Sequence, residues 1–177
     1  MMAIRPTSRS TWLLLAAAFA VVVGLGCSSS DDNNDDNPIA PASLNVVLLG
    51  NAEGAPGDTT TILVSIENPD PLTGVQFDLL HDEAVFTVIE AVTTSRTSGF
   101  EVFHSAPEAG IARVLLTDLS GTAQLAAGSG GVVTLRVAID PSAPVGASAM
   151  ETADCIGTDV AATPVSLGSA NGTFTVH

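Results

Sequence analysis

Apolar and polar residues alternate through two neighbouring stretches of the chain, residues 58–68 and 72–81. The apolar positions of these stretches are Ile62, Val64 and Ile66 in the first and Val75, Phe77, Leu79 and His81 in the second. A period of two residues predicts a β-strand with one buried face. Pro69 and Pro71 separate the stretches and cannot continue a hydrogen-bonded ladder, so we expect a turn there. Two half-buried strands need a second sheet over their apolar side.

The same pattern continues along the chain. Further strands are expected at residues 44–49, 87–92, 100–105, 111–118, 132–140, 147–154 and 171–176. Residues 120–131 hold four glycines and are expected to form a loop with at most one helical turn. Eight or nine short strands separated by glycine and proline turns predict an all-β fold, an antiparallel two-sheet β-sandwich or jelly roll.

The first 42 residues differ from the rest. Arg5 and Arg9 precede an unbroken apolar or glycine run from Trp12 to Leu25. The run is too short for a membrane span, so we interpret residues 1–26 as a signal peptide. Residues 27–42 are rich in Asp and Asn and are expected to form a disordered acidic tether. This leaves residues 43–177 for the folded domain.

The end of the apolar run resembles a bacterial lipoprotein signal, because a small residue, Gly26, is followed by Cys27. The resemblance implies that Cys27 is lipidated and becomes the new amino terminus. Ser28 after the cysteine resembles lipoproteins that are sent to the outer membrane. The expected location is therefore a lipid anchor in the outer membrane or at the cell surface. The alternative is a plain signal peptide with an incidental cysteine.

Charge narrows the class of partner. After residue 26 the chain has three arginines, Arg96, Arg113 and Arg136, no lysine, and nineteen acidic residues, a net charge of 3 − 19 = −16. Such a surface repels phosphate backbones, which argues against a nucleic-acid partner and suits a cationic or calcium-loaded one. Membrane contact is expected only through the lipid. Cys155 is the only other cysteine after residue 26, and we expect a small buried thiol.

The chemistry of a catalytic or metal site is not apparent. His81, His104 and His177 show neither the spacing of a zinc site nor the order of a catalytic triad. We therefore expect no enzyme activity, no bound metal and no cofactor. His81 and His104 are expected on the inner sides of their strands, as structural histidines.

Three segments, taken in order, resemble the cohesin domain. They are Gly54–Asn68, Leu72–Asp82 and Gly130–Gly146, and the similarity extends over about residues 43–176. The resemblance implies a nine-stranded jelly roll that binds dockerin modules in scaffolds of polysaccharide-degrading enzymes. In dockerin-binding cohesins of the best-known type, the outward side of the third strand carries Asn-x-Asp. The matching positions here are Gly74 and Gln76.

The resemblance also implies a protein-binding face. The third, fifth, sixth and eighth strands would form one sheet, whose expected outward residues are Gln76, Asp78, Leu80, Arg113 and Leu115. Two leucines beside an arginine and an aspartate suit an interface with an apolar centre and a polar rim. The alternative is that the loop at residues 120–131 covers these leucines.

Other functions remain open beside the docking of an exported protein module. The fold is related to carbohydrate-binding modules, which need aromatic rings under the sugar. The chain has no tyrosine, and its one tryptophan lies in the signal. Phe103 is the one plausible exposed ring and therefore the one candidate for a carbohydrate contact; the alternative is a position in the core or at a sheet edge. A third hypothesis is a structural exported domain without a ligand.

Overall fold

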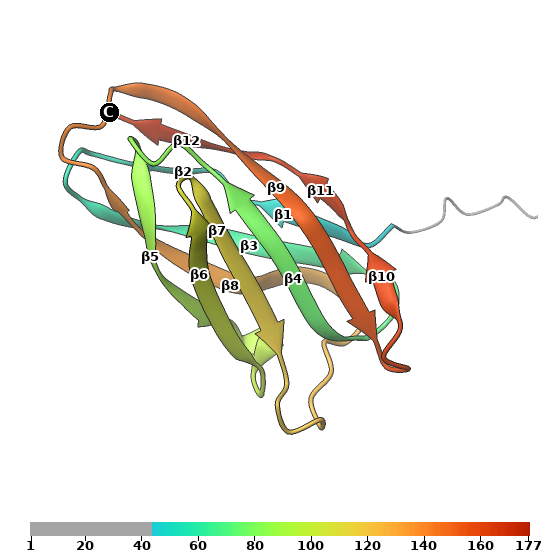
Figure 1. Cartoon of the computed structure of the whole chain (residues 1–177). Coiled ribbons are helices and arrows are strands. Elements are labelled where there is room, and N and C mark those ends of the chain that lie inside the picture. The colour runs from blue at the N-terminus through green and yellow to red at the C-terminus, as the bar shows by residue number, and fades with distance from the viewer. Residues whose placement is uncertain (1–43) are drawn as a thin grey trace, which may run out of the picture. The chain divides into compact units, whose positions relative to one another are not determined.

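The computed structural model describes residues 44–177, which form two β-sheets packed face to face (Figure 1). One sheet has the order β11 (Gly168–Ala170), β1 (Val46–Leu49), β3 (Thr59–Asn68), β8 (Gly128–Ile139) and β5 (Phe86–Thr93). The other has the order β2 (Ala52–Gly54), β12 (Gly172–Val176), β9 (Gly146–Asp159), β4 (Leu72–Leu80), β7 (Ile111–Thr117) and β6 (Glu101–Glu108), with β10 (Pro164–Ser166) beside β9.

The predicted sandwich is confirmed. Neighbouring strands are antiparallel, except for the pairs β1–β11 and β12–β2. The apolar sides of β3 and β4 meet in the core, where Val64, Ile66 and Phe77 are completely buried. Phe86, Phe100 and Phe174 are buried with them. The alternation of apolar residues therefore specified which face of each sheet is buried.

Two details of the expected secondary structure are wrong. The described residues hold twelve strands rather than eight or nine, because the short strands β2, β10 and β11 form outside the expected strands. The one helical segment of residues 44–177 is a 3₁₀ turn, η1 (Ser95–Thr97), rather than a turn within residues 120–131. Thr94 caps η1, because its hydroxyl accepts a hydrogen bond from the Arg96 amide and the Thr97 hydroxyl accepts one from the Thr94 amide.

The position of η1 follows from a mismatch between two strands. β5 pairs with β8 only as far as Thr93, opposite Val133, so the preceding part of β8 has no strand on that side. Side chains of the η1 segment take the place of the missing strand. Thr94 donates to the carbonyl of Gly131 at 2.6 Å, and Thr97 donates to that of Val132 at 2.7 Å. Buried carbonyl groups are therefore satisfied by hydroxyl groups instead of a ladder.

Candidate functional site

Four strands, β9, β4, β7 and β6, lie side by side and form an open outer face (Figure 1). They correspond to the eighth, third, sixth and fifth strands expected from the sequence, so the predicted sheet is confirmed. The register places four outward residues in one row across these strands. Phe103 is opposite Leu115, Leu115 is opposite Gln76, and Gln76 is opposite Ile156. We call these four residues the docking row.

Three members of the docking row are large apolar residues open to solvent. Phe103 is 48% exposed, Leu115 39% and Ile156 47%. Single exposed apolar residues are normal on protein surfaces, but three in one row make this face a candidate interaction surface. Phe103 lies on the edge strand β6 with its ring exposed, so it is not in the core and stays a candidate contact residue.

Ile156 was missed by the sequence analysis because its strand was expected to end at residue 154. β9 continues to Asp159 through a β-bulge, in which Gln76 is opposite Ile156 while Asp78 is opposite Ala153. Asp154 adopts a φ of 48° there. One extra residue reverses the alternation, so Ile156 points outward. No apolar pattern in the sequence signals this reversal.

Asp78 differs from the expectation for an accessible contact residue. It lies on the outward side of β4 but is only 4% exposed, because Arg113 covers it. The Nε and Nη2 atoms of Arg113 donate to the two carboxylate oxygens of Asp78, each at 2.7 Å. Hydrogen bonding to Asp78, with the charges of Asp78 and Asp154, raises the pKa of Arg113. The Arg113 guanidinium group is therefore already paired with the Asp78 carboxylate.

The leucines of the expected face have different surroundings. Leu115 is exposed, whereas Leu80 is half-buried at the end of β4. The alternative that residues 120–131 cover Leu115 does not hold. The apolar residue of that loop, Leu125, is completely buried and exchanges two backbone hydrogen bonds with Leu72, at the opposite end of β4 from Leu80.

The two strand histidines are also placed differently. His81 is half-buried and stacks on Phe86 with a centroid distance of 4.6 Å, and burial lowers its pKa. His104 lies on the expected inner side of β6, opposite the buried Val114, but at this sheet edge it is exposed rather than a buried structural histidine. Both histidines line a hollow of about 90 Å³ with Glu83 and Glu108. Residues 44–177 contain no group of three His, Cys, Asp or Glu side chains that could hold a metal.

Cys155 and a hollow near Asn68 lie away from the outer face of β9, β4, β7 and β6 or beside its bulge.

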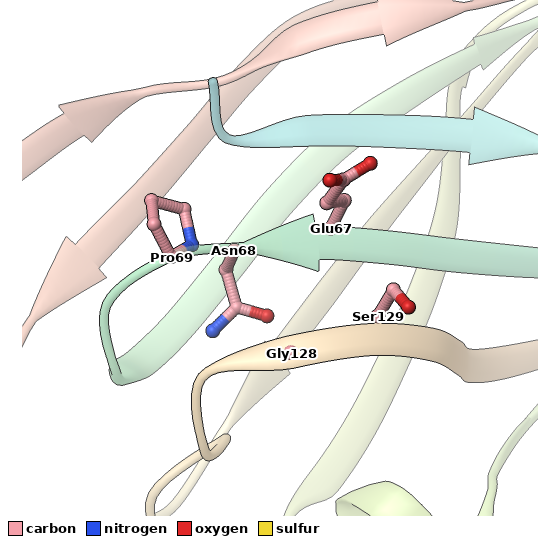
Figure 2. A pocket seen from close by; sticks show the side chains of 5 residues that line it. All are labelled: Glu67, Asn68, Pro69, Gly128 and Ser129. Carbon is pink, nitrogen blue, oxygen red and sulfur yellow. The ribbon is translucent and has the colours of Figure 1, made fainter. Parts of the chain in front are cut away.

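Cys155 was expected to be buried, but it is only half-buried beside the β9 bulge, and partial burial raises the pKa of its thiol. A second hollow, of about 210 Å³, is lined by Glu67, Asn68, Pro69, Gly128 and Ser129. Figure 2 shows where these residues lie, at the ends of β3 and β8. The Asn68 side chain there is already bonded, since its Oδ1 accepts from Arg96 at 2.6 Å and its amide donates to the carbonyls of Asp70 and Ala126.

Cys27 and the expected signal and tether lie outside the described residues. Within residues 44–177, no helix is long and apolar enough to cross a membrane.

Comparison with known proteins connects this geometry to a family. The family model of the cohesin domain matches residues 46–176. No curated protein matches the chain. Many solved structures do.

Three of these structures illustrate the likeness. The cohesin CaCohA2 of Clostridium acetobutylicum is 24% identical, with a TM-score of 0.62, 76% of this chain and 91% of that chain covered. A non-cellulosomal cohesin of the archaeon Archaeoglobus fulgidus is 19% identical, with a TM-score of 0.64 and coverages of 76% and 92%. A type I cohesin–dockerin complex of Clostridium thermocellum gives 16% identity, a TM-score of 0.65 and coverages of 76% and 94%.

At these identities the solved structures establish the jelly-roll sandwich fold of the cohesins. The family match covers β1 through β12. A cohesin domain is a non-catalytic module for protein–protein interaction, which confirms the expectation that this domain is not an enzyme. The chain belongs to the cohesin domain family.

Proposed function

We propose that this domain docks an exported protein module of the dockerin type on the outer face of β9, β4, β7 and β6. The observation that carries the proposal is the docking row, which presents Phe103, Leu115 and Ile156 to solvent in a line across four strands. Protein interfaces combine an apolar, well-packed centre with a polar rim, and a few central residues supply most of the affinity. Family membership and neighbours solved as cohesin–dockerin complexes support the choice of partner.

The test is binding of the full chain to a panel of dockerin modules, including those of the Clostridium acetobutylicum and Clostridium thermocellum cohesins. Leu115→Asp and Ile156→Asp should each weaken binding by at least about tenfold, since a charge would be buried in the contact. Leu63→Asp is the matched control, because Leu63 is 47% exposed and β3 belongs to the other sheet. Binding that survives both substitutions in the row would refute this face.

Arg113→Glu is not a suitable probe of binding. The substitution would place a second carboxylate against Asp78, which is nearly inaccessible and depends on Arg113 for charge compensation. Loss of binding could then come from loss of the fold.

The proposal extends to location. Export and a lipid on Cys27 would hold the domain at the outer membrane or cell surface, with residues 28–42 as a spacer that gives it reach. This rests on the apolar run that ends at a small residue and a cysteine. Metabolic labelling with palmitate should mark the wild-type chain in the membrane fraction, and Cys27→Ala should abolish the label. Labelling that persists in Cys27→Ala would contradict the anchor.

A second candidate function is favoured by one observation. The Phe103 ring is exposed and borders a hollow of about 190 Å³ with Gln76, His104 and Arg113, a combination of a flat ring and polar groups that suits a sugar. Either function would suit a protein that takes part in polysaccharide degradation. Carbohydrate binding predicts retention on an insoluble polysaccharide that Phe103→Ala abolishes. A negative result across a glycan panel would remove it.

A further inference from the structure

The docking face is hollowed beside the docking row, at a strand position without a side chain. Gly74 lies on the outward side of β4, with Thr117 of β7 on one side and Thr158 of β9 on the other. Together with Gln76, Leu115 and Ile156 these residues surround an open hollow of about 220 Å³. The hollow therefore has a glycine floor, two threonine walls and the apolar part of the docking row along one rim.

The backbone does not require a glycine at this position. Gly74 is absent from the residues with positive φ. A Cβ atom built on Gly74 would come no closer than 3.6 Å to the Leu116 carbonyl and 3.9 Å to Thr158, which are ordinary contacts. A side chain would thus fit without strain, and it would occupy the hollow. What the glycine contributes is free space on the docking face.

The size and walls of the hollow define what fits it. A cavity of about 150 Å³ lined by apolar side chains is enough to hold a benzene ring. The hollow above Gly74 is larger and open on one side, so it can receive one aliphatic or aromatic side chain from a partner. The exposed side chains of Leu115 and Ile156 would lie against that group and lose their contact with water.

Acidic residues near the hollow indicate which residues should flank that side chain in the partner. Glu101 is opposite Thr117, and Asp118 and Asp159 follow Thr117 and Thr158 directly. Hydrogen bonds from Ser120 and its neighbours lower the pKa of Asp118 to about 2, so it is ionised at neutral pH. None of these three carboxylates forms an ion pair with an arginine of residues 44–177.

The arginines of the described chain are engaged elsewhere. Arg113 bonds Asp78, Arg136 lies 3.5 Å from Glu90, and Arg96 donates to carbonyl groups and to Asn68. None of the three carboxylates lines the hollow, but each adjoins a threonine that does, and none has a compensating arginine among residues 44–177. A partner with basic side chains would supply that charge and would be steered toward the face.

We infer that the partner inserts a single large apolar side chain, flanked by lysine or arginine residues, into the hollow above Gly74. This inference rests on the proposed docking function and names the chemistry of the partner. Gly74 then determines specificity through the space it leaves, and Glu101, Asp118 and Asp159 determine the charge of the segment that approaches.

A phage-displayed library of random dodecapeptides, panned against the immobilised full chain at low salt, reads out this chemistry directly. Enriched peptides should share a large apolar residue with Lys or Arg within a few positions. A synthetic consensus peptide should bind Gly74→Val at least about tenfold more weakly than wild type, because valine fills the hollow. Its affinity for the wild type should also fall as salt rises, because salt screens the charges of Glu101, Asp118 and Asp159.

Gly74→Val should fold, since valine favours strands and its Cβ would meet no close contact. Thr61→Val is the control, as it places the same side chain on the exposed side of β3 in the other sheet and should bind the peptide like wild type. Far-UV circular dichroism would verify that both variants are folded. The inference is overturned if no peptides are enriched, if they are neutral or acidic, or if Gly74→Val binds them as well as wild type does.

The two proposals fail in different ways. If a dockerin module fails to bind Leu115→Asp but binds Gly74→Val as it binds wild type, the proposal of the docking face stands and the inference about the hollow above Gly74 fails. If instead the protein binds no dockerin module but its selected peptides require the open hollow, the inference about the hollow stands and the dockerin proposal fails.

Discussion

Thr97 offers a sharp test of how the unpaired edge of β8 is satisfied. Its side chain is completely buried, and the two shortest hydrogen bonds of its hydroxyl are to backbone groups. It donates to the Val132 carbonyl at 2.7 Å and accepts from the Thr94 amide at 2.9 Å. Thr97→Val keeps the shape of the side chain and removes both contacts. Thr97→Ser keeps the hydroxyl and removes one methyl group.

The expected magnitudes separate hydrogen bonding from packing. A buried polar group without a partner costs about 1–3 kcal/mol. Thr97→Val leaves the buried Val132 carbonyl and the half-buried Thr94 amide without this partner, so it should lower the free energy of unfolding by about 2–4 kcal/mol. The lost methyl group in Thr97→Ser should cost only about 1 kcal/mol. If hydrogen bonding contributes more to stability than packing at this position, Thr97→Val is therefore more destabilising than Thr97→Ser, although valine is the more apolar residue.

Urea denaturation followed by far-UV circular dichroism is the appropriate assay, because the folded domain contains neither tryptophan nor tyrosine for fluorescence. With a slope of about 2 kcal/mol per M, Thr97→Val should lower the unfolding midpoint by about 1–2 M. Thr97→Ser should lower it by about 0.5 M. A serine variant that is as unstable as the valine variant, or more so, would refute the role of the hydroxyl.

Three further predictions concern loops. Leu125→Ala should lower the free energy of unfolding by about 2–4 kcal/mol in thermal or urea melts, because Leu125 is completely buried although it lies outside the strands; an unchanged melt would contradict its anchoring role. The pKa of Asp118 is lowered to about 2 from 3.8, so its stabilising effect is complete above about pH 4 and disappears toward pH 2. The difference in stability between wild type and Asp118→Ala should shrink over that range, and a difference that stays constant would exclude the ionised carboxylate as its cause. Gly110→Ala should destabilise by at least about 1–2 kcal/mol, since φ is 73° and the added Cβ would lie 2.7 Å from the His81 carbonyl; the melting temperature measures it, and an unchanged value would disprove the strain.

Most of the fold could be predicted from the sequence, because the signals for it are local. The alternation in residues 58–68 and 72–81 specified the buried side of β3 and β4, and Val64 and Phe77 are indeed completely buried. Proline and glycine marked where strands end. The short strands β2, β10 and β11 could not be predicted, because three residues are too few for a pattern and each depends on a neighbour that is distant in the sequence.

The sequence by itself determined the all-β class, the buried faces of β3 and β4, the acidic charge and the presence of Leu115 and Gln76 on one outward side. Only the tertiary structure decided which side chains meet there. The bulge at Asp154 turned Ile156 outward, Arg113 closed over Asp78, and pairing between β4, β7 and β9 left Gly74 as the floor of a hollow. The physical reason is that alternation is a property of a single strand, whereas register, bulges and ion pairs depend on the partner strand.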